Sequence, residues 1–190
     1  MEYKPEDQYQ SMIRAYEALR SLATDIGKTA TVGDPAPADA ARAFFLQCYH
    51  LKDWLKKDPR IKRPQDVEDV ITNSAALSLA ADLCNSLKHA GLDKPPRSGM
   101  SLDRINMAYS LQVPSSGAAG QIRMARNPSD GDTVALSRGG VADLKGRAVA
   151  TARVVLTIGG TNHDALEVAT RCVSEWDSFL AVQGIVFPKS

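Results

Sequence analysis

Residues 82–113 read DLCNSLKHAGLDKPPRSGMSLDRINMAYSLQV, and the spacing of their apolar positions changes within this stretch. As far as His89 the apolar residues recur every three or four positions, which is the period of a helix. After the loop-like segment 92–101, apolar residues alternate with mostly polar ones from Ile105 to Val113, which is the period of a strand. The stretch therefore predicts that a helical part of the chain stops at Gly91 and that a β-rich part follows it.

Four helices are expected around this change of period. Apolar residues recur at helical spacing over residues of about 6–26, 38–57, 65–90 and 163–182. Asp58-Pro59 ends the second helix, because the residue before a proline is pushed out of the α region. Pro64 suits the first turn of the third helix, where a missing N–H donor costs nothing.

A β-rich insertion is expected over residues of about 102–158. Beyond the first strand, short β-like runs at 121–126, 133–137 and 147–158 predict a meander of three or four antiparallel strands. Thr161, with Asp164 three residues on, resembles a capping box that starts the last helix. The predicted fold class is α+β, with residues 1–190 as a single domain. It is a bundle of about four helices with a small antiparallel sheet inserted between the third and the fourth.

Composition places the chain among ordinary globular proteins. Of its 190 residues, 44% are hydrophobic and 24% are charged. No apolar run approaches the roughly 20 residues that span a bilayer, and the start Met1–Asp7 lacks the pattern of a signal peptide. The chain has three cysteines, which lie in apolar helical patterns and form no CxxC pair: Cys48, Cys84 and Cys172. Their odd number and their positions favour a role as small core residues over disulfides or zinc ligands. We therefore expect a cytoplasmic protein without a membrane partner.

Positive charge is concentrated in two segments, although the net charge of the chain is only +1. Residues 51–64 carry six Lys or Arg against two Asp, a net charge of +4. Residues 91–160 carry nine against five, again +4. Such segments can attract a phosphate backbone, and they can equally serve solubility.

Two polar groupings on the predicted helices could carry chemistry. His50 and Asp53 are three residues apart and share one helix face. Asp82, Asn85 and His89 are spaced by three and four and form a polar stripe on an apolar helix. Taken singly, each residue also fits a structural role, such as a surface pair, a buried amide or a cation at a helix end.

The layout of long helices, one of which ends in Asn85-x-x-x-His89, resembles the HEPN superfamily. Its members are helical bundles, often dimeric, and many are metal-independent ribonucleases of toxin and defence systems. The resemblance implies RNA as a partner, a homodimer and no cofactor. It further implies that His89 is a general acid or base and that Asn85 orients it or binds phosphate, with His50 and Asp53 in the same cleft.

The chain departs from the HEPN pattern where the family has an arginine, because that position is Cys84. A guanidinium there would stabilise charge on the scissile phosphate, and a thiol offers neither charge nor paired donors. Three lysines on the predicted helices could bind RNA in place of the missing arginine: Lys88, Lys52 and Lys56. The resemblance thus implies either an endoribonuclease with a different arrangement or a catalytically weakened relative.

Two further functions remain open from the sequence. His50, Asp53, Asp82 and His89 could converge as ligands of a metal-dependent hydrolase, although they lack a Glu-x-x-His spacing. The β-rich insertion could instead offer a sheet edge or a basic surface to a protein or RNA partner, without catalysis. A ribonuclease of the HEPN type should cleave RNA in EDTA, and a metal-dependent hydrolase should lose activity in it. An interaction module should need the insertion to bind its partner.

Overall fold

A computed structural model of the chain describes residues 4–29, 36–89, 96–99, 102–112, 124–126, 134–136, 149–158 and 160–188. This part of the chain contains helices α1 (Pro5–Thr29), α2 (Ala36–Leu55), α3 (Pro64–Asn73), α4 (Ala75–His89) and α5 (Ala165–Val182). It also contains strands β1 (Leu102–Gln112), β2 (Met124–Arg126), β3 (Val134–Leu136), β4 (Val149–Ile158) and β5 (Thr161–Asp164). The predicted α+β class is confirmed.

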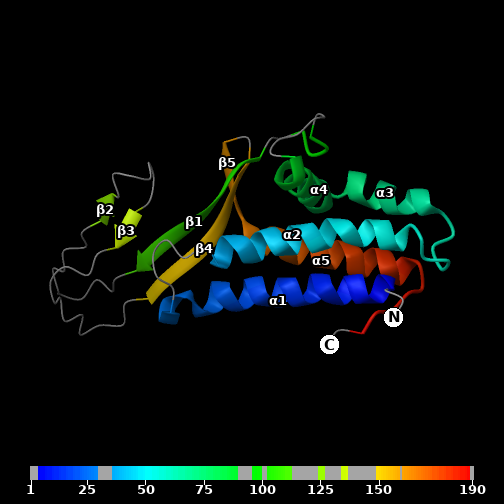
Figure 1. Cartoon of the computed structure of the whole chain (residues 1–190), viewed down its shortest axis with the longest axis horizontal. Helices are drawn as coiled ribbons and strands as arrows, with labels where there is room; N and C mark the ends of the chain where they lie inside the picture. The colour runs from blue at the N-terminus through cyan, green and yellow to red at the C-terminus, as the bar shows by residue number, and fades with distance from the viewer. Residues whose placement is uncertain are drawn as a thin grey trace.

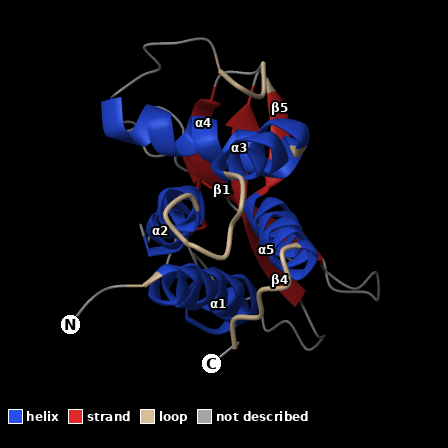
Figure 2. Ribbon diagram, turned by 90° about the vertical axis from the view of Figure 1, so that its right-hand side faces the viewer, coloured by secondary structure: helices blue, strands red, loops and turns tan. Residues whose placement is uncertain are grey.

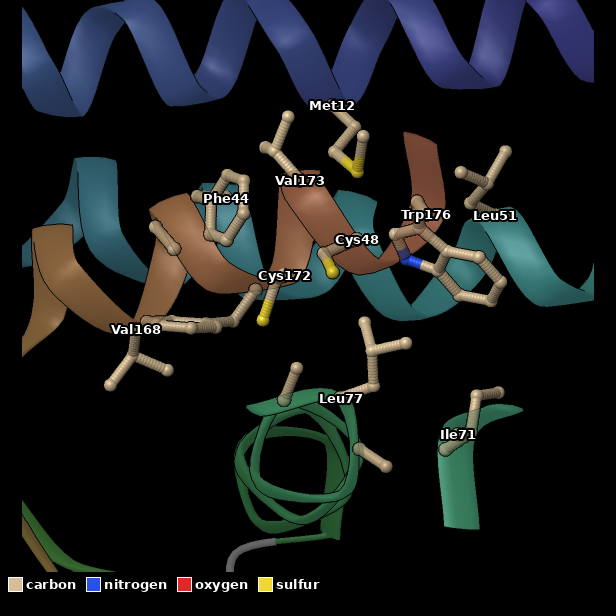
Figure 3. Close-up of a cluster of buried hydrophobic side chains, with 14 of the residues drawn as sticks. Met12, Phe44, Cys48, Leu51, Ile71, Leu77, Val168, Cys172, Val173 and Trp176 are labelled. Atoms are coloured by element: carbon tan, nitrogen blue, oxygen red, sulfur yellow. The ribbon is translucent and has the colours of Figure 1, made fainter. Parts of the chain in front are cut away.

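The helices form three levels, as Figures 1 and 2 show from two directions. Helices α2 and α5 lie side by side in the middle, with α1 on one side of them and α3 and α4 on the other. The core lies between these levels and includes Met12 of α1, Phe44 of α2, Leu77 of α4 and Trp176 of α5 (Figure 3). Every apolar position predicted for the face of α2 is buried: Ala41, Phe44, Phe45, Cys48, Leu51 and Leu55.

The predicted helix over residues 65–90 is in fact two helices, and this corrects the predicted number of four. Ser74 separates α3 from α4 with an extended backbone (φ −99°, ψ 119°). Its hydroxyl oxygen accepts a hydrogen bond from the Leu77 backbone N–H at 3.2 Å, as an N-capping serine does. Since the strands follow α4, the sheet lies between the fourth and fifth helices, and the predicted placement between the third and fourth is wrong.

The strands do not form one meander. Strand β4 pairs with β1 and with β5, both antiparallel, in a sheet of order β1-β4-β5. Strands β2 and β3 pair with each other in a separate two-stranded sheet. Along β4, Val154, Leu156 and Ile158 are buried and alternate with half-buried residues, so one face of the sheet packs on the helices.

The junction between the sheet and the last helix also differs from the prediction. Thr161 is a strand residue, and the cap of α5 is Asp164, whose carboxylate accepts hydrogen bonds from the Leu166 and Glu167 N–H groups. After α5, Ile185 and Phe187 pack on the core, whereas Val186 points to solvent. No helix in the described residues has the length and apolar content to cross a membrane.

Candidate functional site

Glu68 of α3 lies where α2, α3 and the turn 96–99 meet. One oxygen of its carboxylate accepts a hydrogen bond from the Lys56 ammonium at 2.9 Å. The other oxygen accepts one from the Arg97 guanidinium at 3.0 Å. The Lys52 ammonium lies 3.8 Å from the first oxygen. Three cations therefore converge on one carboxylate, and we call these four residues the Glu68 cluster.

The helices place the lysines of the cluster without strain. Lys52 lies in the last turn of α2, and Lys56 follows the end of that helix, with its N–H hydrogen-bonded to the Lys52 carbonyl oxygen. Both side chains reach Glu68 of α3. The Lys52 ammonium is 3.0 Å from an Asp53 oxygen and 4.7 Å from the centre of the Tyr49 ring, and only 13% of its side chain is exposed. Lys56 and Arg97 are each 37% exposed, so solvent reaches them more freely.

Arg97 is brought to the cluster by Asp82, which is buried on α4. The two carboxylate oxygens of Asp82 accept hydrogen bonds from the backbone N–H groups of Arg97 at 2.8 Å and of Ser98 at 2.7 Å. The turn closes at Gly99, whose φ of +73° is a conformation that favours glycine. The Asp82 carboxylate thus fixes the backbone from which the Arg97 guanidinium reaches α3.

The charges of the cluster perturb one another. Burial alone raises the pKa of Glu68, but hydrogen bonds from Lys56 and Arg97, together with the Lys52 charge, hold that pKa below its usual value of 4.5. For Lys52, burial acts to lower the pKa, and the hydrogen bond to Asp53 and the neighbouring negative charges raise it overall. Both residues therefore remain ionised at neutral pH.

The connector between α2 and α3 extends this basic region. Asp58 is buried and accepts hydrogen bonds from the backbone N–H and the guanidinium of Arg60, at 3.0 Å and at 2.7–3.2 Å. These bonds lower the pKa of Asp58 and raise that of Arg60. Lys57, Lys62 and Arg63 are exposed on the connector that this pair holds in shape.

The predicted residues on α2 point away from the core. On a helix of 3.6 residues per turn, His50 and Asp53 lie about 140–160° from the buried Cys48. His50 is half-buried, and the Asp53 side chain is 55% exposed. Asp53 accepts a hydrogen bond from the Lys52 ammonium, and this ion pair links Asp53 to the basic region.

The predicted residues on α4 are described only in part. Asn85 is half-buried, one turn after Asp82. His89 is the last residue of α4, and the side chains of Lys88 and His89 lie outside the described residues. The shared crevice of His50, Asp53, Asn85 and His89 therefore stays a prediction.

Of the predicted RNA-binding residues, the structure brings Lys52 and Lys56 together. Their partners Glu68 and Arg97 were not among the residues predicted for the site. One sequence feature could have pointed to Arg97, because this residue lies in the Pro- and Gly-containing segment that follows the polar stripe of α4. The structure shows that Asp82, a member of that stripe, holds this segment by a hydrogen bond.

The metal-site hypothesis stays a prediction. Of its four residues, Asp82 accepts one backbone hydrogen bond on each carboxylate oxygen, from the turn 96–99. Among the described residues there is no group of three or more His, Cys, Asp or Glu side chains that could hold a metal ion.

Comparison of the chain with protein-family models, with curated proteins and with solved structures gave no match.

Proposed function

We propose that this chain is an RNA-associated protein that holds RNA phosphates on the basic region formed by the Glu68 cluster and the α2–α3 connector. The observation that supports this function is the convergence of Lys52, Lys56 and Arg97 on the single carboxylate of Glu68. The exposed cations of the connector lie at the same end of α2, where that helix gives way to α3 (Figure 1).

The hydrogen-bonding capacity of these cations suits phosphate. A lysine ammonium has three donors and an arginine guanidinium has five, and Lys56 and Arg97 each use one on Glu68. Solvent-facing donors on these partly exposed side chains can bind phosphate oxygens while Glu68 stays in place.

Salt dependence tests the proposal directly. Binding of a mixed-sequence, single-stranded RNA to the full chain would be followed by fluorescence anisotropy between low and physiological salt. For a single strand, log K falls with log salt by about 0.7 for each phosphate contact. A variant with Lys56→Gln, Lys62→Gln and Arg63→Gln should lose a slope of about 2, since three contacts are removed.

A matched control removes the same charge elsewhere. Arg20, Arg42 and Arg171 are exposed cations that each pair with an acid three or four residues away on the same helix. Replacing all three by glutamine should leave the salt slope unchanged. Equal losses in the two triple variants, or no RNA binding by the unaltered chain, would refute the proposal.

The same assay separates binding from cleavage. The HEPN resemblance implies a metal-independent endoribonuclease in which His89 is the general acid or base and Asn85 assists it. If the chain cleaves RNA in EDTA, His89→Ala should abolish cleavage and leave the salt slope of binding intact. If the unaltered chain binds RNA and leaves it uncut, it is a binding relative without catalysis.

A further inference from the structure

Two of the three cysteines meet in the core. Cys48 of α2 and Cys172 of α5 are fully buried, and both are free thiols. Figure 3 shows their sulfur atoms on the side of α2 and α5 that faces α4. There the Cys172 thiol donates a hydrogen bond to the Ala76 carbonyl oxygen of α4 at 3.3 Å.

The thiols also interact with each other. Burial raises the pKa of Cys172 well above its ordinary value, and the neighbouring Cys48 raises it further. Two helices in contact have axes about 8–10 Å apart, and each carries its Cα atoms about 2.3 Å from the axis. Residues that point straight at the neighbouring helix thus have Cα atoms about 3.5–5.5 Å apart, and residues turned to one side lie farther apart. These separations overlap the Cα span of a disulfide, which is about 4.4–6.8 Å.

We propose that Cys48 and Cys172 are an oxidation site, and that hydrogen peroxide converts them into a disulfide that ties α2 to α5. In the first step a cysteine thiolate attacks peroxide, which becomes hydroxide, and the sulfur becomes a sulfenic acid. In the second step the other thiolate attacks that sulfur and displaces hydroxide. With protons counted, two thiols and one peroxide give one disulfide and two waters.

The surroundings make this reaction slow and selective. A thiolate is the reacting species, and burial disfavours it at neutral pH, so the pair stays reduced until local opening of the core exposes a sulfur. Once one sulfur is oxidised, its neighbour is already in place, whereas the Cys84 thiol is on α4. The product joins α2, which carries Lys52 and ends directly before Lys56, to the last helix of the bundle. It makes the core beneath the proposed RNA-binding region sensitive to oxidants.

The test uses the reduced full chain and hydrogen peroxide under native conditions. Remaining thiols would be blocked with a maleimide after unfolding, and the peptides mapped by mass spectrometry under non-reducing conditions. Before blocking, the expected product is a monomer lighter by about 2 Da. After blocking, the map should contain a Cys48–Cys172 peptide pair and a single maleimide, on Cys84. A pair that includes Cys84, a mixture of all three pairs, or only sulfinic and sulfonic acids at single cysteines would overturn the proposal.

Variants sharpen the result. Cys84→Ser should still form the internal disulfide, and Cys48→Ala should not. If Cys48→Ala fails to fold, the peptide map of the unaltered chain still decides the question. Trp176 supplies an optical readout, because it lies one turn from Cys172 with its indole beside Cys48 (Figure 3). In a Trp54→Phe background its fluorescence should fall on oxidation and recover with dithiothreitol, and an unchanged signal would count against the bond.

Discussion

Replacing Glu68 by glutamine should weaken the fold and strengthen RNA binding at the same time. The substitution keeps the shape of the side chain and removes the one carboxylate on which Lys52, Lys56 and Arg97 converge. Loss of that charge costs the folded state two charge-assisted hydrogen bonds. It also leaves the three cations with no common counter-charge, which favours the approach of a phosphate.

The expected loss of stability is about 1–2 kcal/mol. A hydrogen bond to a charged group contributes about 1.5–3 kcal/mol when it is shielded from solvent. The donors Lys56 and Arg97 are each 37% exposed, so screening reduces each contribution to about 0.5–1 kcal/mol. For a chain of this size the melting temperature should fall by about 3–6 °C. The RNA salt slope should steepen by about 0.7, the equivalent of one added phosphate contact.

Glu167→Gln is the matched control for this prediction. Glu167 pairs with Arg171 at 2.6 Å on the surface of α5, so its loss changes the net charge equally but touches no other element. Urea unfolding should show a loss below about 0.5 kcal/mol, and the salt slope should stay unchanged. If Glu68→Gln and Glu167→Gln gave the same stability and the same RNA affinity, the Glu68 cluster would have no special role.

Acid unfolding gives a second measure of the same carboxylate. The folded pKa of Glu68 is held below 4.5, so its contribution to stability is present above that pH and is lost as pH falls through the folded pKa. Glu68→Gln should therefore flatten the acid limb of the stability curve below about pH 4.5, relative to the unaltered chain.

Three other substitutions test the scaffold. Tyr9→Phe removes the 2.6 Å hydrogen bond from the phenol to Asp177 and should cost about 1 kcal/mol in urea unfolding; no loss would mean that water replaces this bond fully. Asp82→Asn places an amide N–H₂ against an N–H group of the turn 96–99, so the free energy of unfolding should fall by about 1.5–3 kcal/mol. RNA affinity should fall as well, because the Arg97 backbone is no longer held in position. Asp58→Asn should lower stability above about pH 4 and remove part of its acid dependence, since pairing with Arg60 lowers the Asp58 pKa; an acid limb identical to that of the unaltered chain would contradict this.

The parts of the fold that follow from the sequence are those governed by local spacing. A helix over most of α2 and a strand over the residues of β4 were both predicted, because a helix and a strand impose periods of 3.6 and 2 on any buried face. The break at Ser74 was missed, because apolar residues continue at helical spacing on both sides of it. Asn73 and Ser74 were the local signal, since both residue types favour caps over helix interiors.

Contacts between distant segments could not be predicted in the same way. The pairing of β4 with β1 passes over β2 and β3, and hydrophobic alternation gives no information on which strands become neighbours. For the site, Lys52 and Lys56 were predicted to bind RNA as cations of the second helix. Glu68 as their partner depends on how α2 packs on α3. The hydrogen bonds from the turn 96–99 to Asp82 could not be predicted either, because they depend on how that turn packs on α4.

The two lysines of the Glu68 cluster should have different roles, Lys52 in stability and Lys56 in RNA binding, although they are only one turn apart. Lys52 is 13% exposed and contacts Asp53, Glu68 and the Tyr49 ring, so Lys52→Gln should lower the free energy of unfolding and change the RNA salt slope little. Lys56 is 37% exposed, so Lys56→Gln should reduce the slope by about 0.7. It should cost no more stability than the about 0.5–1 kcal/mol of the bond between Lys56 and Glu68. Urea unfolding and RNA titration of both variants decide the matter. Equal effects of the two variants on the salt slope would mean that burial of Lys52 does not keep it from the phosphate, and the division between a structural and a binding lysine would be wrong.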